Sequence, residues 1–221
     1  MPAPSIAQQV DDFNTGFTAQ IGDRLADVFS GEQAELRAAG VSAGALGTDE
    51  TAPDADLLTA DGKTVTFSSV IDDAVTVVVF YRGAWCPYCN ITLRAYQQDL
   101  LPALEKRGAQ LVAISPQTAD GTSQSQSNGT LDFTVLSDPG NVLADRFGIV
   151  TEPSAAAQEA HTELGFSVSD SNADATARVP SPSVYVIDGA GRIRFADIRV
   201  DYTSRTEVTD IVRAIDRLDG N

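Results

Sequence analysis

The stretch VTVVVFYRGAWCPYCN (residues 75–90) decides the fold, and it holds Cys86 and Cys89, the only two cysteines of the 221-residue chain. Its first part, residues 75–81, is an unbroken apolar run rich in β-branched residues, which predicts a buried central strand. The following residues, 91–108, carry apolar side chains at helical spacing. The sequence therefore places a C-x-x-C pair where a central strand turns into a helix, a position typical of redox-active thiols.

The first turn of a helix suits a reactive cysteine. Its unpaired N–H groups and the positive end of the helix dipole stabilise a thiolate, and they can lower a cysteine pKa to roughly 3.5–7.5. Cys86 comes first, so we expect it to be the nucleophile and the more acidic thiol. Pro87 suits the first helical position, where a missing N–H costs nothing. Cys89 follows three residues later on the same helix face, so the pair can close into an intramolecular disulfide.

The cysteine pair could also belong to a zinc site or form a purely structural disulfide. A zinc site needs about four ligands, whereas the chain has two cysteines and one histidine, His161, so we expect no metal and no cofactor. A purely structural disulfide would close a three-residue loop and restrain little chain entropy. His161 lies in an alanine-rich, acidic segment, and we expect it to be a surface residue.

Composition argues against several classes of partner. The formal net charge is -16, from 31 acidic and 15 basic residues, which disfavours binding to nucleic acid or to an anionic membrane. No apolar run reaches the ~18 residues of a membrane-spanning helix. The first residues lack the basic and apolar regions of a signal peptide, so we expect a cytoplasmic protein. In a reducing compartment, a close cysteine pair is more often catalytic than structural.

The remaining pattern predicts two parts. Residues 1–48 form an N-terminal helical extension that Gly31 interrupts, and this extension either packs on the domain or serves as the arm of a homodimer. Residues 49–221 form an α/β domain with a central mixed sheet covered by helices on both faces.

Local signals place the other elements of this domain. Two strands meet at a turn within residues 56–70, further strands cover 109–115 and 133–138, and a hairpin covers 182–198. Pro102 predicts a kink in the helix after the cysteines. A terminal helix over 204–218 is expected to start at a Ser204 cap, with Glu207 completing an S-x-x-E box.

Five segments carry a family resemblance: APDADLLTADGKTVTFSSV, FYRGAWCPYCNITLRAYQ, LVAISPQT, VLSDPGNVLADRFGIV and PSVYVIDGAGRIRFADIRVDYTSR. The resemblance covers residues 52–218, and it is to the thioredoxin fold, more narrowly to the peroxiredoxin-like group of the alkyl hydroperoxide reductase and thiol-specific antioxidant family. The resemblance implies a thiol-dependent peroxidase in which Cys86 attacks hydrogen peroxide or an organic hydroperoxide and becomes a sulfenic acid. Cys89 would resolve it to a disulfide, which a thioredoxin-like protein or a low-molecular-weight thiol would reduce.

The chain departs from the family where the peroxide is normally held. Gly83 stands in place of the usual Thr and Val79 in place of the usual Pro. Pro182 stands in place of the usual Arg, and it matches instead the cis-proline that faces the cysteines in thioredoxins, so we expect a cis bond before it.

Arg82 is the group that the sequence favours as a substitute, because its charge is permanent and it lies four residues before Cys86. A surface arginine paired with a carboxylate is the alternative. Arg205 and Arg178 are weaker candidates, and Trp85 is expected to shape a docking surface beside the sulfurs.

Three functions stay open on this basis. The predicted one is an oxidoreductase of the thiol-dependent peroxidase type. A thiol–disulfide oxidoreductase of thioredoxin type gains support from the missing Thr and Arg. The third is a redox-sensing module whose cysteine pair only reports oxidation.

Overall fold

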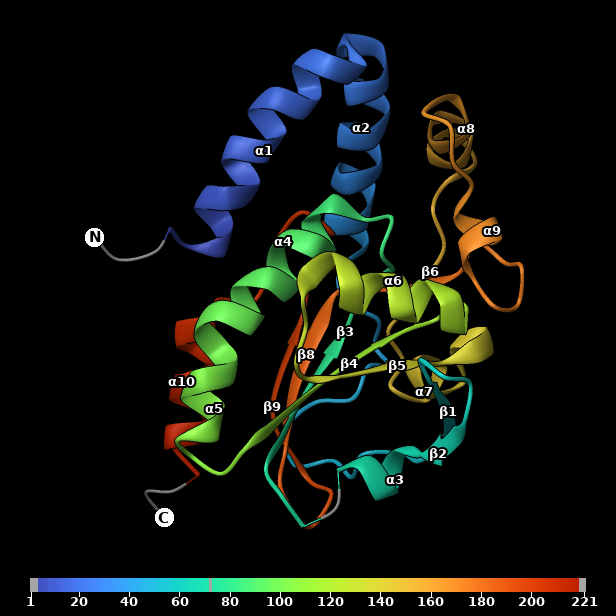
Figure 1. Cartoon of the computed structure of the whole chain (residues 1–221). Helices are drawn as coiled ribbons and strands as arrows, with labels where there is room; N and C mark the ends of the chain where they lie inside the picture. Colours follow the sequence, from blue (N-terminus) through green and yellow to red (C-terminus); the bar gives the residue numbers. More distant parts are fainter. Residues whose placement is uncertain (1–3, 72, 219–221) are drawn as a thin grey trace.

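A seven-stranded mixed sheet forms the centre of the structure, a computed structural model that describes residues 4–71 and 73–218 (Figure 1). Its strands are β1 (Asp56–Thr59), β2 (Thr64–Thr66), β3 (Thr76–Phe80), β4 (Gln110–Ser115), β5 (Thr134–Ser137), β8 (Ser183–Ile187) and β9 (Ile193–Ile198). Their spatial order is β2-β1-β5-β4-β3-β8-β9. The pairs β3–β4 and β4–β5 are parallel and the other neighbours antiparallel. The predicted thioredoxin-like mixed sheet is confirmed.

Helices cover both faces of this sheet. They are α1 (Ile6–Ile21), α2 (Asp23–Ala39), α3 (Phe67–Val70), α4 (Pro87–Ala95), α5 (Leu101–Glu105), α6 (Ala119–Gly129), α7 (Val142–Arg146), α8 (Ala155–Glu163), α9 (Val168–Ser171) and α10 (Val208–Asp216). A 3₁₀ turn (Pro139–Asn141) precedes α7, and a small ribbon pairs β6 (Val150–Thr151) with β7 (Val179–Pro180). Within the described residues, no helix is both long and apolar enough to cross a membrane.

The side chains of β3 alternate between two hydrophobic cores, as expected for a strand buried on both faces. Val77 and Val79 pack with side chains of α4, α5 and α10, whereas Val78 and Phe80 pack with side chains of α3 and α7. The strand is therefore fixed from both sides, and its carboxyl end holds the cysteine loop at a defined edge of the sheet.

The helix after the cysteines is irregular. Between α4 and α5 the chain makes a π-helical turn over Tyr96–Leu100, and Pro102 follows in the first turn of α5. Proline has no N–H to donate to the preceding turn, which disturbs the regular hydrogen-bond ladder. The kink expected near Pro102 takes the form of this π-turn.

The N-terminal extension is a helical hairpin, α1–α2, that stands over the start of α4 (Figure 1). Helix α1 packs on α4, and α2 packs on α8. The expected break at Gly31 is wrong, because α2 continues through it. The chain turns instead at Gly22, whose φ of 77° is a conformation open to glycine. The two predicted parts also include residues that the structure does not describe, namely 1–3, 72 and 219–221.

The predicted Ser204 cap is also wrong. Helix α10 begins at Val208, and Glu207 occupies its N-cap without a side-chain capping bond. The Glu207 carboxylate instead accepts hydrogen bonds from the backbone N–H groups of Ile6 (3.1 Å) and Ala7 (2.8 Å). A carboxylate at the positive end of a helix is stabilising, so Glu207 ties the first turn of α1 to the carboxyl-terminal part of the chain.

Replacing Glu207 with Ala should release this end of α1 and lower the free energy of unfolding by about 1 kcal/mol, the usual cost of a lost helix cap. For a chain of this size that corresponds to a fall in Tm of about 2–4 °C. Thermal unfolding by circular dichroism measures it. Glu105→Ala, at an exposed position of α5, is the control, and an equal Tm for both variants would contradict the capping role.

Candidate active site

Cys86 and Cys89 lie at the start of α4, just beyond the carboxyl end of β3. Cys86 is the N-cap residue and Cys89 lies in the first turn. Both are reduced thiols, and each is only 1% exposed. The strand-to-helix placement predicted from the sequence is confirmed, and it presents both sulfurs to the positive end of the helix dipole.

Gly83 is required by the shape of the cysteine loop. Its φ of 143° lies in a region that side chains rarely adopt, and a Cβ there would sit 2.6 Å from Nε1 of Trp85. The family's usual Thr therefore cannot occupy this position while the Trp85 indole keeps its place. The absence of the usual Thr at position 83 therefore follows from the packing of Trp85.

A buried polar network holds the loop in place. The side-chain oxygen of Gln117 accepts a hydrogen bond from the backbone N–H of Ala84 (2.9 Å), and its amide nitrogen donates to the hydroxyls of Tyr81 (2.9 Å) and Ser125 (2.7 Å). From the other side, the amide of Asn90 donates to the carbonyl of Ala84 (2.8 Å). The backbone before Cys86 is thus fixed before any substrate arrives.

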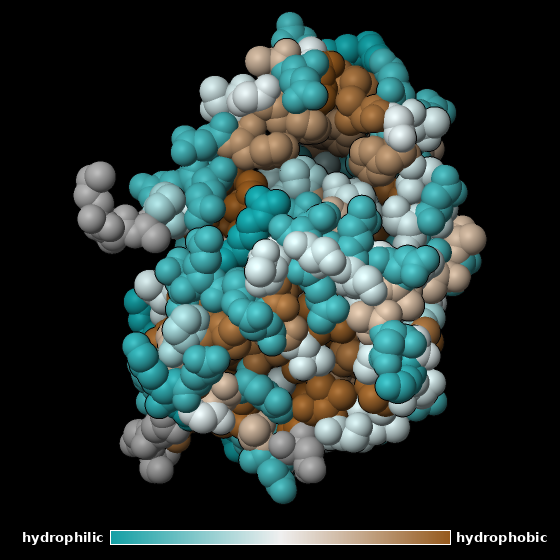
Figure 2. Space-filling view, viewed as in Figure 1, coloured by the Kyte–Doolittle hydropathy of each residue, from teal (hydrophilic) through white to brown (hydrophobic). Residues whose placement is uncertain are grey.

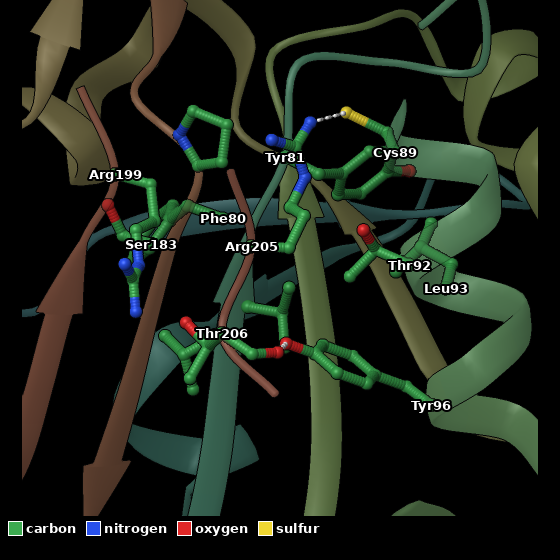
Figure 3. Close-up of a pocket in the computed structure, with 13 residues that line it drawn as sticks. Phe80, Tyr81, Cys89, Thr92, Leu93, Tyr96, Ser183, Arg199, Arg205 and Thr206 are labelled. Atoms are coloured by element: carbon green, nitrogen blue, oxygen red, sulfur yellow. Dashed lines mark hydrogen bonds between the residues drawn. The ribbon is translucent and has the colours of Figure 1, made fainter. Parts of the chain in front are cut away.

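Arg205 is the basic residue that reaches the sulfurs. Its Nη2 lies 3.6 Å from Sγ of Cys89 and 3.9 Å from Sγ of Cys86, and Figure 3 shows the guanidinium directed at Cys89. Nowhere in residues 4–71 and 73–218 does a carboxylate form an ion pair with it. The sequence favoured Arg82 over Arg205. Arg205 lies 116 residues beyond Cys89, and no local pattern indicates that the chain returns to the cysteines there.

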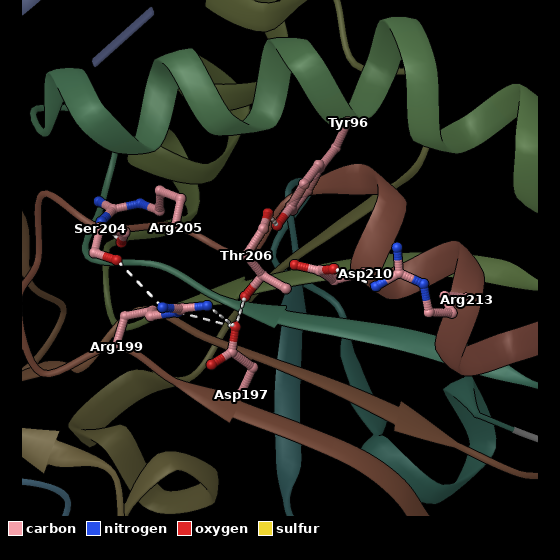
Figure 4. Close-up of polar contacts among 8 residues, drawn as sticks. All are labelled: Tyr96, Asp197, Arg199, Ser204, Arg205, Thr206, Asp210 and Arg213. Carbon is pink, nitrogen blue, oxygen red and sulfur yellow. Dashed lines mark hydrogen bonds and ion pairs between the residues drawn. The ribbon is translucent and has the colours of Figure 1, made fainter. Parts of the chain in front are cut away.

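The segment after β9 holds Arg205 in this position (Figure 4). The Arg205 Nη1 donates to the carbonyls of Tyr202 and Ser204. The next residue, Thr206, accepts a hydrogen bond at its carbonyl from the Tyr96 hydroxyl (2.7 Å), and its own hydroxyl donates to Asp197 (2.8 Å). The guanidinium is therefore oriented by the backbone and directed away from competing acids.

Arg82 is buried, not a surface residue. It is 4% exposed, and its guanidinium lies 4.9 Å from the ring centre of Trp85 and 4.2 Å from that of Tyr202. The surface ion pair weighed as an alternative is therefore wrong. Among the described residues no hydrogen bond joins this guanidinium to either sulfur, so its charge acts on the thiols through space.

The two thiols differ in acidity, and the order is the reverse of that expected. Burial, together with the hydrogen bond to Cys89 and its negative charge, raises the pKa of Cys86 well above its usual value. Burial also acts to raise the pKa of Cys89, but the hydrogen bond from Cys86, the charge of Arg205 and the backbone N–H of Arg82 outweigh it and lower that pKa to about 5. The hydrogen bond between the sulfurs and the charge of Arg205 therefore favour one shared proton in the resting pair, with Cys89 the more acidic thiol.

With this geometry in view, comparison with protein families gives one match: the AhpC/TSA family, over residues 48–196. The chain belongs to the AhpC/TSA family. It is an oxidoreductase of the thiol peroxidase type, as members of that family are. Among curated proteins, none matches this chain.

Solved structures of family members share the fold. Prx3 of Vibrio vulnificus, solved reduced and in complex with hydrogen peroxide, aligns with a TM-score of 0.63 at 14% identity, covering 77% of this chain and 99% of its own. A peroxiredoxin-like protein of Aquifex aeolicus gives 0.62 at 15% identity, covering 79% and 88%. Peroxidoxin BcpB of Mycobacterium tuberculosis gives 0.60 at 18% identity, covering 78% and 98%.

The expected cis bond before Pro182 is wrong. No cis peptide occurs within the described residues, and trans is the preferred form of an X–Pro bond unless the surroundings select the other. The ring nevertheless lines, with Cys89 and Arg205, a small cavity of about 10 Å³. Pro182 is therefore close to Cys89. Arg178, the other weak candidate, lies away from the sulfurs in an ion pair with Asp145.

His161 is another residue that the sequence misplaced. It is 6% exposed, and its ring packs against Phe29 (5.1 Å), Trp85 (5.7 Å) and Phe166 (4.8 Å). Burial, assisted by the charge of Arg82, lowers its pKa to about 4, so it is neutral at pH 7. The acidic, alanine-rich context suggested exposure, but α8 turns this face towards α2 and the cysteine loop.

A cavity of about 590 Å³ opens over Cys86. Its walls come from the cysteine loop, from α8 and, outside the region matched by the family, from the α1–α2 hairpin. Figure 2 shows the molecule hollowed below the turn of this hairpin, with apolar residues at the edge. Cys86 lines this cavity and Cys89 does not, which makes Cys86 the thiol that an incoming substrate meets first.

The acidity of the pair predicts a pH profile. Alkylation by iodoacetamide should be nearly constant from pH 8 to 6 and should fall as the pH drops through about 5, because the thiolate stabilised by Arg205 is then protonated. Mass spectrometry of alkylated wild-type, Cys86→Ser and Cys89→Ser proteins measures it. A midpoint near 8.5, the value of an ordinary cysteine, would contradict this arrangement.

Replacing Arg205 with Met should raise the pKa of Cys89 from about 5 towards the usual range and slow the reaction with peroxide by at least about tenfold, or about 1.4 kcal/mol. Arg82→Met should have a smaller effect, since its guanidinium does not contact the sulfurs. Stopped-flow tryptophan fluorescence measures both rates. Arg178→Met is the control, and a rate loss equal to that of Arg205→Met would argue for a non-specific charge effect.

Proposed function

We propose that this AhpC/TSA-family protein reduces hydrogen peroxide or organic hydroperoxides at Cys86, through a sulfenic acid and a Cys86–Cys89 disulfide. The observation that carries this proposal is the pair of buried thiols under one guanidinium, with Arg205 Nη2 3.6 and 3.9 Å from the two sulfurs. The neighbouring Cys86 opens onto the large cavity. The family's usual Thr and Arg are absent from their positions in this chain. Arg205 thus supplies the positively charged group at the sulfurs.

The first step uses the shared proton. When the proton of Cys86 passes to the Cys89 thiolate, the Cys86 thiolate attacks the terminal oxygen of the peroxide. A sulfur–oxygen bond forms, the O–O bond breaks, and its electron pair leaves on the other oxygen, which takes up a proton from solvent to give water or an alcohol. Arg205 and Arg82 face the negative charge that develops, and such preorganised cations lower the barrier.

The second step closes the pair. The sulfur of Cys89 attacks the sulfenic sulfur of Cys86, the S–O bond breaks, and the hydroxyl leaves as water with the remaining thiol proton. One thiol, one thiolate, one peroxide and one proton from solvent thus give one disulfide, one alcohol or water, and one further water. A thioredoxin-like protein or a low-molecular-weight thiol then returns the pair to its reduced form, which suits a reducing, cytoplasmic compartment.

A thiol–disulfide oxidoreductase is the second candidate, and one observation favours it. Pro182 lines the same small cavity as Cys89 and Arg205, near the position where thioredoxins carry their active-site proline.

Peroxide-treated wild-type protein should lose two hydrogens by mass spectrometry, because the two sulfurs share one helix turn. Cys89→Ser should accumulate a sulfenic acid that dimedone traps at Cys86, and Cys86→Ser should give no adduct. A disulfide-reduction assay run in parallel separates the second candidate. A dominant intermolecular disulfide, or disulfide reduction without any reaction with peroxide, would count against the proposal.

A further inference from the structure

The α1–α2 hairpin builds half of the cavity over Cys86. Ten of the twenty residues that line the cavity belong to α1 and α2, and the region matched by the family begins only at residue 48. Half of the chamber lining therefore lies outside the part of the chain that the family model matches. Its volume of about 590 Å³ is within the range of roughly 300–1,000 Å³ typical of small-molecule sites, and hydrogen peroxide, with two heavy atoms, would fill little of it.

The chemistry of the walls is apolar and nearly uncharged. Aromatic and aliphatic side chains dominate: Phe13, Phe17, Ile21, Phe29, Leu164 and Phe166. Although the chain has 31 acidic residues, none of them lines this cavity. The one permanent charge in the lining is that of Arg82, whose guanidinium is stacked on Trp85 and Tyr202. Such walls favour a hydrocarbon body and offer no carboxylate to a cationic molecule.

The hairpin is fixed to the redox loop and not loosely attached. The hydroxyl of Tyr88, the residue before Cys89, donates to Oδ1 of Asn14 (2.7 Å), and its ring meets Phe13 edge-on at 5.4 Å. On the other helix, Glu32 accepts a hydrogen bond from the backbone N–H of Ser154 (2.9 Å) at the start of α8. The chamber is therefore preformed, which reduces the entropy that a ligand would otherwise lose on ordering it.

His161 contributes a polar side chain to the wall of the cavity. Its Nδ1 is buried and has no hydrogen-bond partner among the described residues, and buried polar atoms without partners are uncommon in folded proteins. An oxygen atom of a bound molecule can provide such a partner. The wall thus combines an apolar surface with neutral polar side chains, among them Asn14, Gln33 and His161.

We propose that the α1–α2 hairpin is the specificity-determining element of this enzyme, and that its cavity binds the hydrocarbon part of a bulky organic hydroperoxide whose peroxide group meets Cys86. This inference rests on the proposed peroxidase function and adds the selection among peroxides. The apolar body of the substrate is held by residues of the hairpin, while the O–O bond is cleaved by the cysteine loop. The hairpin thereby sets the ratio of activity on bulky hydroperoxides to activity on hydrogen peroxide.

Filling the cavity tests the proposal with the full chain. Ala26 of α2 lines the cavity, and Ala26→Phe places a ring there. The ratio of kcat/KM for cumene hydroperoxide to kcat/KM for hydrogen peroxide should fall by at least about tenfold. Ser30→Phe, at a second lining position of α2, should lower the same ratio and guards against a folding defect peculiar to one variant. The control, Ala34→Phe, makes the same change at an exposed α2 residue outside the lining and should leave the ratio unchanged.

The outcomes separate this inference from the proposed function. If every variant folds with wild-type circular dichroism and forms sulfenic acid with hydrogen peroxide, yet the ratio stays constant, the hairpin proposal is overturned and the peroxidase function stands. A wild-type protein that reacts with neither peroxide overturns both. If Ala26→Phe slows only the reduction of the Cys86–Cys89 disulfide by a thioredoxin-type protein, the cavity serves the reductant, and the proposed role in substrate selection is wrong.

Discussion

The contact between Arg205 and two buried sulfurs is the interaction on which the rest of the site depends. A thiolate at 1% exposure has lost its hydration, and a charge in such a place is costly unless a fixed opposite charge meets it. Arg205 meets it at 3.6 Å, because backbone carbonyls and the bond from Tyr96 to Thr206 hold its loop over α4. The sheet, the π-turned helix and the final loop therefore act together to keep one sulfur ionised.

The second cation works differently. Arg82 lies between two aromatic rings, an arrangement that stabilises a partly desolvated guanidinium without neutralising it. Its charge acts on the neighbouring thiols and also disfavours protonation of His161. In the proposed function, two arginines at new positions take the part of the family's usual Thr and Arg, and Gly83 leaves room for the Trp85 indole.

The hairpin changes the surroundings of this chemistry without altering its core. Family members share the sheet and the cysteine-bearing helix, whereas the walls of the cavity come largely from α1 and α2. Asn14 and Glu32 attach these helices to the redox loop and to α8, and Glu207 fixes the first turn of α1. The cysteines are in this way enclosed partly by residues that lie outside the region matched by the family.

The sequence by itself determined the elements whose causes are local. The β-branched run before the cysteines specified a buried strand, the C-x-x-C spacing placed both sulfurs on one helical turn, and Pro102 marked the irregular helix. Only the tertiary structure decided which arginine contacts the sulfurs, that Glu207 caps α1 and not α10, and that His161 is buried. Each of these depends on residues more than 70 positions apart meeting in space. Hydrophobic periodicity reports which face of an element is buried, but it carries no information about which distant charge will lie against that face.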